Sequence, residues 1–195
     1  MNTLSTFLEL HHLKFLTIHI LGVVLGLGGA TISDLLFFKF LKDFRISKKE
    51  QEVLQLLKNL ILGALFIIIL TGVAIYLPNS EAYNQSPAFL MKVTAVVILT
   101  LNGIALHLFI APYLLHFNLK NHQKMGRMWH KLAFALGAIS AVSWYSVFLI
   151  AMLKSDLPPS FMWLLGLYSA ILALGIGVSQ YFETRFCKEA NQAKN

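Results

Sequence analysis

Long apolar stretches, separated by short polar links, dominate the pattern of this chain. A helix needs about 20 apolar residues to cross a bilayer. Five stretches are long enough, and we predict membrane-spanning helices at residues 13–40, 54–77, 88–114, 131–153 and 161–182. The predicted fold is an all-α, polytopic transmembrane helix bundle that forms a single integral membrane domain over residues 1–195.

The polar links carry local signals of their own. The SKKE stretch from Ser47 to Glu50 predicts a capping box at the start of the second long helix. In this motif the serine side chain accepts from the backbone amide of the glutamate three residues later, and the glutamate side chain accepts from the backbone amide of the serine. The stretch LPNSEAYNQSP at 77–87 predicts a turn-rich loop, and DLPPS at 156–160 predicts a tight break.

Composition places the chain in the membrane class. Only 13% of its residues are charged and 57% are hydrophobic, whereas soluble domains contain about 25% charged residues. The net charge of +7 resides mainly in the links, so we interpret it as a signal of membrane topology and of contact with anionic lipid, and we expect no nucleic-acid partner.

The single cysteine, Cys187, excludes an intrachain disulfide. Phosphate-loop and dinucleotide-binding signatures are absent, and the sequence leaves open whether the protein is an enzyme.

The basic residues divide unequally between the two ends of the predicted bundle. Most lie in the links after helices one and three and in the C-terminal tail: Lys42, Arg45, Lys48, Lys49, Lys120, Lys124, Arg127, Lys131, Arg185, Lys188 and Lys194. The other end holds Lys14, Lys92 and Lys154. Because cytoplasmic loops are enriched in Lys and Arg, we predict that the N-terminus lies outside and the C-terminus in the cytoplasm.

Polar and small residues share one face of the first predicted helix. At 100° per residue, Asp34 lies about 60° from His19. The small residues within roughly 80° of His19 are Gly22, Gly26, Gly29, Ala30 and Ser33. The opposite face carries Leu21, Leu25, Ile32 and Leu35. Small residues allow helices to approach closely in lipid, and ionisable residues inside membranes face the bundle interior. We therefore expect this stripe to face the other helices.

The third predicted helix repeats this arrangement with Lys92 and His107. The spacing suggests an outer polar layer of His19 with Lys92 and an inner layer of Asp34 with His107, with Asn102 between them in depth. Simpler interpretations stay open. Lys92 would snorkel to the interface, and His107 would be a hydrogen-bonded core histidine. Asp34 would form a buried pair, with His107 or with a neighbour such as Lys39.

Stripes on the last two predicted helices favour packing. Helix four carries His130, Gly137, Ala141 and Trp144 on one side. Helix five carries a stripe of small residues that ends at Gln180: Gly166, Ala170, Ala173 and Gly177. We expect both stripes to face neighbouring helices.

Two stretches carry a resemblance to known families: HILGVVLGLGG at 19–29 and SPAFLMKVTAVV at 86–97. They resemble small bacterial membrane proteins of the CopD-type copper-resistance group and the HemJ-type protoporphyrinogen oxidases, together with uncharacterised families of similar size. The likeness covers roughly residues 13–116. It implies a bacterial cytoplasmic membrane location, bound haem b, and functional roles for His19 and Lys92. An arginine expected shortly after the helix-one glycines is absent and Asp34 occupies that neighbourhood, which argues against protoporphyrinogen oxidation itself.

Two functional hypotheses follow. In the first, the protein binds haem b in a redox role, with His19, Lys92, His107 and His130 as cofactor-binding candidates and His107 and His130 as an inner ligand pair. In the second, it is a small proton- or cation-coupled transporter, expected to be a homodimer, with Asp34 and Asn102 in a relay beside His107. A membrane accessory or assembly role is a further alternative. No metal-ion site is predicted, and the sequence names no substrate or redox partner.

Overall fold

The computed structural model describes residues 3–40, 47–110, 124–153 and 160–192, and within them the fold is helical without strands. Five helices are long and apolar enough to cross a membrane. They belong to α2 (His12–Phe40), α3 (Lys48–Tyr76), α5 (Pro87–Ala105), α7 (Lys124–Met152) and α8 (Phe161–Gln192). A short helix, α1 (Thr3–Leu10), precedes them. The protein is therefore an all-α, multi-pass integral membrane protein, as the apolar stretches predict.

The long helices extend beyond several predicted spans. α3 begins at Lys48, before position 54, and α8 continues to Gln192, beyond position 182. α5 continues without a break into a π-helical segment, η3 (Leu106–Ile110). The predicted end of the third span, 111–114, lies outside the described residues. Hydropathy locates the lipid-crossing part of a helix, whereas the helix itself runs on into water.

The capping box at the start of α3 is confirmed. The Glu50 amide donates to Ser47 Oγ at 3.3 Å, and the Ser47 amide donates to Glu50 Oε2 at 2.8 Å. The predicted loop after α3 is wrong: residues 77–87 contain a 3₁₀ turn, η2 (Leu77–Asn79), and a short helix, α4 (Ser80–Asn84). Proline near the N-terminus of η2 is compatible with helical geometry there, because its missing amide has no partner to lose. Except for Ser160, the predicted break at 156–160 lies outside the described residues.

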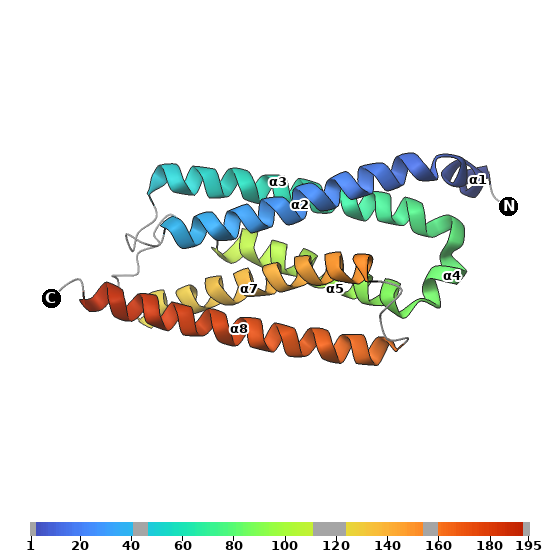
Figure 1. The fold of residues 1–195 in the computed structure, drawn as a ribbon. Helices are drawn as coiled ribbons and strands as arrows, with labels where there is room; N and C mark the ends of the chain where they lie inside the picture. Colours follow the sequence, from blue (N-terminus) through green and yellow to red (C-terminus); the bar gives the residue numbers. More distant parts are fainter. Residues whose placement is uncertain (1–2, 41–46, 111–123, 154–159, 193–195) are drawn as a thin grey trace.

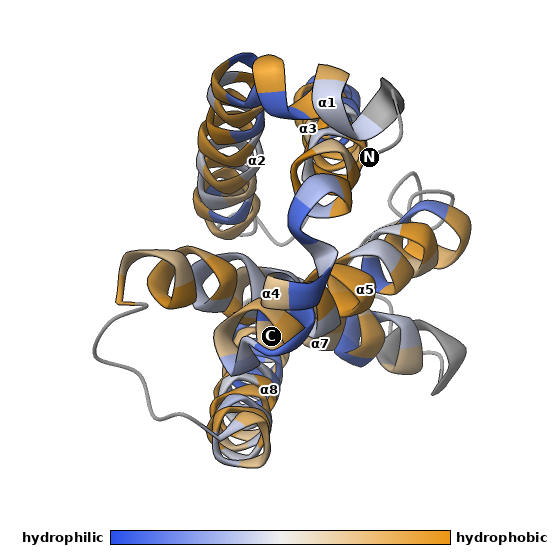
Figure 2. Ribbon diagram, turned by 90° about the vertical axis from the view of Figure 1, so that its right-hand side faces the viewer, coloured by the Kyte–Doolittle hydropathy of each residue, from blue (hydrophilic) through white to orange (hydrophobic). Residues whose placement is uncertain are grey.

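The five long helices form two groups that meet along one seam. α2 packs along α3, while α5, α7 and α8 pack against one another, and α2 contacts α7. Figure 1 shows the helices side by side along one long axis, and Figure 2, viewed along that axis, shows α2 and α3 as a pair beside the other three. α1 and α4 lie at one end of the bundle and the C-terminal end of α8 at the other (Figure 1). The side of the membrane that each end occupies stays a prediction.

The burial pattern of α2 confirms the stripe expected on it. Its buried residues are Gly22, Gly26, Gly29 and Ala30. The large exposed residues on its other side include Leu21, Leu25, Ile32 and Leu35. Trp144 on α7 is also buried, as expected of a packing face. Exposed leucines are stable in lipid, so this face suits contact with the bilayer.

The packing face predicted for the last helix is wrong. Gly166, Ala170, Ala173 and Gly177 are all exposed, and α8 instead buries a face with larger and polar side chains. That buried face includes Leu164, Tyr168, Ser179 and Glu183. The Tyr168 hydroxyl lies 2.7 Å from Ser143 Oγ on α7, and both residues are buried. Polar side chains that can bond across helices thus determine which side of α8 faces inward.

Candidate functional site

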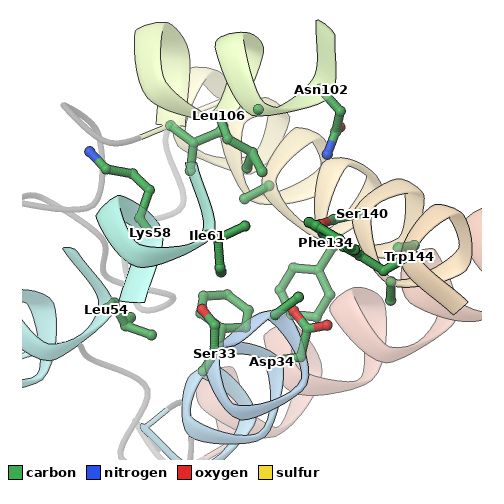
Figure 3. A pocket seen from close by; sticks show the side chains of 18 of the residues that line it. Ser33, Asp34, Leu54, Lys58, Ile61, Asn102, Leu106, Phe134, Ser140 and Trp144 are labelled. Carbon is green, nitrogen blue, oxygen red and sulfur yellow. The ribbon is translucent and has the colours of Figure 1, made fainter. Parts of the chain in front are cut away.

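A cavity of about 810 Å³ lies where the two helix groups meet, and all five long helices contribute to its lining. Most of its wall is apolar. The aromatic side chains among its lining residues are Phe37, Phe38, Phe134, Phe182 and Trp144. Figure 3 shows labelled side chains from α2, α3, α5 and α7 around this shared space. A cavity of this size and composition is typical of a site for a small ligand.

Asp34 is the acidic residue in the cavity wall. It projects from α2 into the space beside Phe134 and Trp144 (Figure 3). Within the described part of the chain, its carboxylate makes no hydrogen bond or ion pair. Neither Lys39 nor His107, the partners considered from the sequence, bonds to it there. A half-buried carboxylate without a partner is costly in an apolar environment, and such groups are commonly kept for function.

Asn102 brings a second incompletely bonded polar group to the cavity. Its side chain is only 5% exposed and reaches from α5 toward α7 (Figure 3). Nδ2 donates to the backbone oxygen of Leu136 at 3.1 Å, whereas Oδ1 is buried without a hydrogen-bond partner. A buried acceptor left unpaired costs about 1–3 kcal/mol.

His107 lines the same cavity and bonds to a lysine that the sequence analysis did not single out. Lys58 Nζ, on α3, lies 3.2 Å from His107 Nδ1. Because an ammonium group only donates, Nδ1 accepts this bond and the proton of the neutral ring lies on Nε2. Lys58 lies within the predicted span 54–77, and a lysine inside a membrane span is the sequence signal that could have identified it as a site residue. The structure thus brings the two residues of the predicted inner layer, Asp34 and His107, to one cavity, together with Asn102.

His19 lies elsewhere, between α2 and α3. Its Nδ1 is 2.9 Å from Thr71 Oγ1, and the Thr71 hydroxyl donates to the Ile67 backbone oxygen at 2.6 Å. Since the hydroxyl has one proton, His19 Nδ1–H is the donor in the first bond. The outer layer of His19 with Lys92 stays a prediction. His19 and Lys92 are not among the residues that line the cavity.

His130 is also away from the cavity wall. It is 2% exposed and lies beside Glu183 and Cys187 of α8. His107 therefore contacts Lys58 at the cavity, whereas His130 lies in a separate cluster with Glu183 and Cys187. Glu183 escaped the sequence analysis because the fifth span was predicted to end at position 182. The spacing of Glu183 and Cys187, one helical turn apart, was the signal that could have revealed the cluster.

Comparison of the chain with protein-family models, with curated proteins and with solved structures finds no match in any of the three. The functional argument therefore starts from the cavity and its polar groups.

Proposed function

We propose that this integral membrane protein binds a small cationic ligand with an apolar body in the cavity between its helices, as a carrier of the proton- or cation-coupled kind. The observation that supports this most directly is Asp34, a carboxylate in the cavity wall that has no bonding partner among the described residues. A bound cation would supply the missing counter-charge.

The rest of the lining supports the same ligand class. Phe134 and Trp144 stand beside Asp34 (Figure 3), and aromatic faces attract cations by about 0.5–2 kcal/mol. Lys58 is the one lysine of the lining, and it lies across the cavity from Asp34 (Figure 3). Its Nζ is 3.2 Å from His107 Nδ1. The positive and negative groups are thus on opposite sides.

Asp34 also provides a means of coupling. When the cation leaves, a proton taken up by the carboxylate removes the uncompensated charge. When the cation returns, that proton is released to water. Exchange of one positive charge for another at a single buried carboxylate couples the two movements, which is the logic of many carboxylate-based carriers.

A pair of probes with similar apolar bodies and opposite charges tests the proposal. We expect tetraphenylphosphonium to raise the thermal unfolding temperature of the detergent-purified protein and tetraphenylborate to have a smaller effect. Asp34→Asn should abolish the difference between the two ions. Ser33→Ala, at the adjacent position in the same lining, is the matched control and should preserve it.

Either of two results would reject the cation site. One is equal stabilisation by the two ions in the wild type. The other is a charge preference that survives in Asp34→Asn. Transport is tested separately with proteoliposomes that carry a pH-sensitive dye inside. We expect tetraphenylphosphonium added outside to cause proton efflux through the wild type and none through Asp34→Asn.

Haem b in the same cavity is the second candidate, favoured by the position of His107 in the lining. One imidazole at the cavity suits a haem with a single histidine ligand, and Lys58 beside it suits a propionate. A haem held by both His107 and His130 does not fit, since His130 faces Glu183 and Cys187 on α8. Absorption spectra of oxidised and dithionite-reduced protein decide this candidate. A Soret band lost in His107→Ala and kept in His19→Ala supports it, and a flat visible spectrum after expression with added haem rejects it.

A further inference from the structure

Three different metal-binding side chains meet between α7 and α8, near the end of the bundle where α8 terminates. The ligand atoms of His130, Glu183 and Cys187 all lie within 4.8 Å of one another. Glu183 is fully buried, His130 is 2% exposed, and Cys187 is partly buried. None of the three belongs to the cavity lining, so this cluster is independent of the ligand site proposed above.

Glu183 has weak compensation for a fully buried acid. The Cys187 thiol donates to Oε1 at 3.3 Å. The Thr184 hydroxyl lies 3.4 Å from Oε2, but its one proton goes to the Gln180 backbone oxygen at 2.9 Å. In the described part of the chain no lysine or arginine forms an ion pair with it, and the one such pair found there joins Arg185 to Glu189. Buried carboxylates are normally paired with a cation or bound to a metal.

We propose that His130, Glu183 and Cys187 form a binding site for a divalent transition metal ion of the Zn²⁺ type. Imidazole, thiolate and carboxylate are the groups that bind zinc in proteins. Binding removes the thiol proton of Cys187 to solvent, so a metal–sulfur bond replaces the hydrogen bond to Glu183. The dication then meets one thiolate, one carboxylate and one neutral imidazole. The charges sum to zero, which suits a buried position.

The spacing of the ligands agrees with this assignment. Zinc bonds of about 2.0–2.3 Å in a tetrahedral arrangement place neighbouring ligand atoms about 3.5 Å apart. The Sγ of Cys187 and Oε1 of Glu183 are already 3.3 Å apart, because the two residues are one turn apart on α8. The ligand atom of His130 lies within 4.8 Å of those of both residues. Three protein ligands leave the fourth position for water.

Cobalt is a sharp probe of this site because the chain has one cysteine. A thiolate-to-cobalt charge-transfer band in the near ultraviolet can arise only from Cys187. We expect the detergent-purified wild type to bind one Co²⁺ per chain with this band and to lose it when Zn²⁺ is added. Cys187→Ser should abolish the band. His130→Ala and Glu183→Gln should each weaken Co²⁺ binding at least tenfold, whereas His107→Ala, the control at the cavity, should bind like the wild type.

The result against the proposal is equally definite. Wild-type protein that is monodisperse and helical, yet shows no such band at excess Co²⁺ and retains no Zn²⁺ after incubation and desalting, would rule the site out. Unchanged Co²⁺ affinity in both His130→Ala and Glu183→Gln would show that the Cys187 thiol alone binds the metal, and it would overturn the three-ligand site. The wild-type measurement alone decides the matter if a variant fails to fold. None of these outcomes depends on the cation site at Asp34.

Discussion

The indole ring of Trp144 on α7 lies directly against the backbone of Gly26 on α2. A Cβ at position 26 would come into severe contact with the six-membered ring, with Cζ3 at 2.8 Å. Trp144 is buried in a cluster with Ala30, Leu65 and Leu99, so the ring cannot move aside easily. This contact joins the α2–α3 pair to the other three helices, and it lies at the cavity wall.

Gly26→Ala is therefore expected to destabilise the bundle. Overpacking of this kind costs about 1–3 kcal/mol, and we expect a lower thermal unfolding temperature in detergent together with weaker binding of the cavity probe. Gly28→Ala is the matched control, because nothing lies within 4 Å of a Cβ at that position. Equal unfolding temperatures for the two variants would show that the helices around Gly26 accommodate an added methyl group without a loss of stability.

The bond between His19 and Thr71 predicts energetic coupling between α2 and α3. Hydrogen bonds between transmembrane helices contribute about 0.6 kcal/mol on average. A double-mutant cycle with His19→Ala and Thr71→Ala should give a coupling free energy of about that size in an SDS unfolding titration. A cycle of His19→Ala with Thr94→Ala serves as the control, since the Thr94 hydroxyl donates to the Leu90 backbone of its own helix. A coupling of zero in the first cycle would mean that His19 does not hold α2 to α3.

The capping box of α3 predicts a smaller, local effect. Loss of a serine N-cap typically costs about 1 kcal/mol, so Ser47→Ala should increase amide hydrogen exchange over the first turns of α3. Glu52→Gln, an exposed substitution in the same turns, should leave that exchange unchanged. Equal protection in wild type and Ser47→Ala would show that the cap adds nothing to the helix.

The sequence predicted the fold and one buried face because membrane constraints are simple. Twenty apolar residues require a helix, and the glycines of α2 mark where another helix can approach. The same reasoning failed for α8. Small residues permit close approach of another helix but do not require it, so the stripe that includes Gly166 can also face lipid. The bonds of Tyr168 and the burial of Glu183 set that side.

The candidate sites were predictable only in part. Asp34 and His107 share a cavity, as their depths in the sequence predicted, because depth along parallel helices follows directly from residue count. Lys58 was missed because sequence spacing does not give the rotation of one helix relative to another. His130 was assigned to the same inner region, yet its partners lie on α8. Whether two residues at one depth touch depends on interhelical packing, which sequence spacing alone does not give.

The positive-inside rule predicts the orientation of the bundle, with the N-terminus outside and the C-terminus in the cytoplasm. Ala82 on α4 and Gln192 at the end of α8 are both exposed and lie at opposite ends of the bundle (Figure 1). In a Cys187→Ser background, which removes the only native thiol, Ala82→Cys should react with a membrane-impermeant maleimide added to intact spheroplasts. Gln192→Cys should react only after the membrane is permeabilised. The reverse pattern would place the basic ends of α7 and α8 outside. The Lys58 and His107 end of the cavity would then face the exterior, and the direction of any proton-coupled cation movement would be inverted.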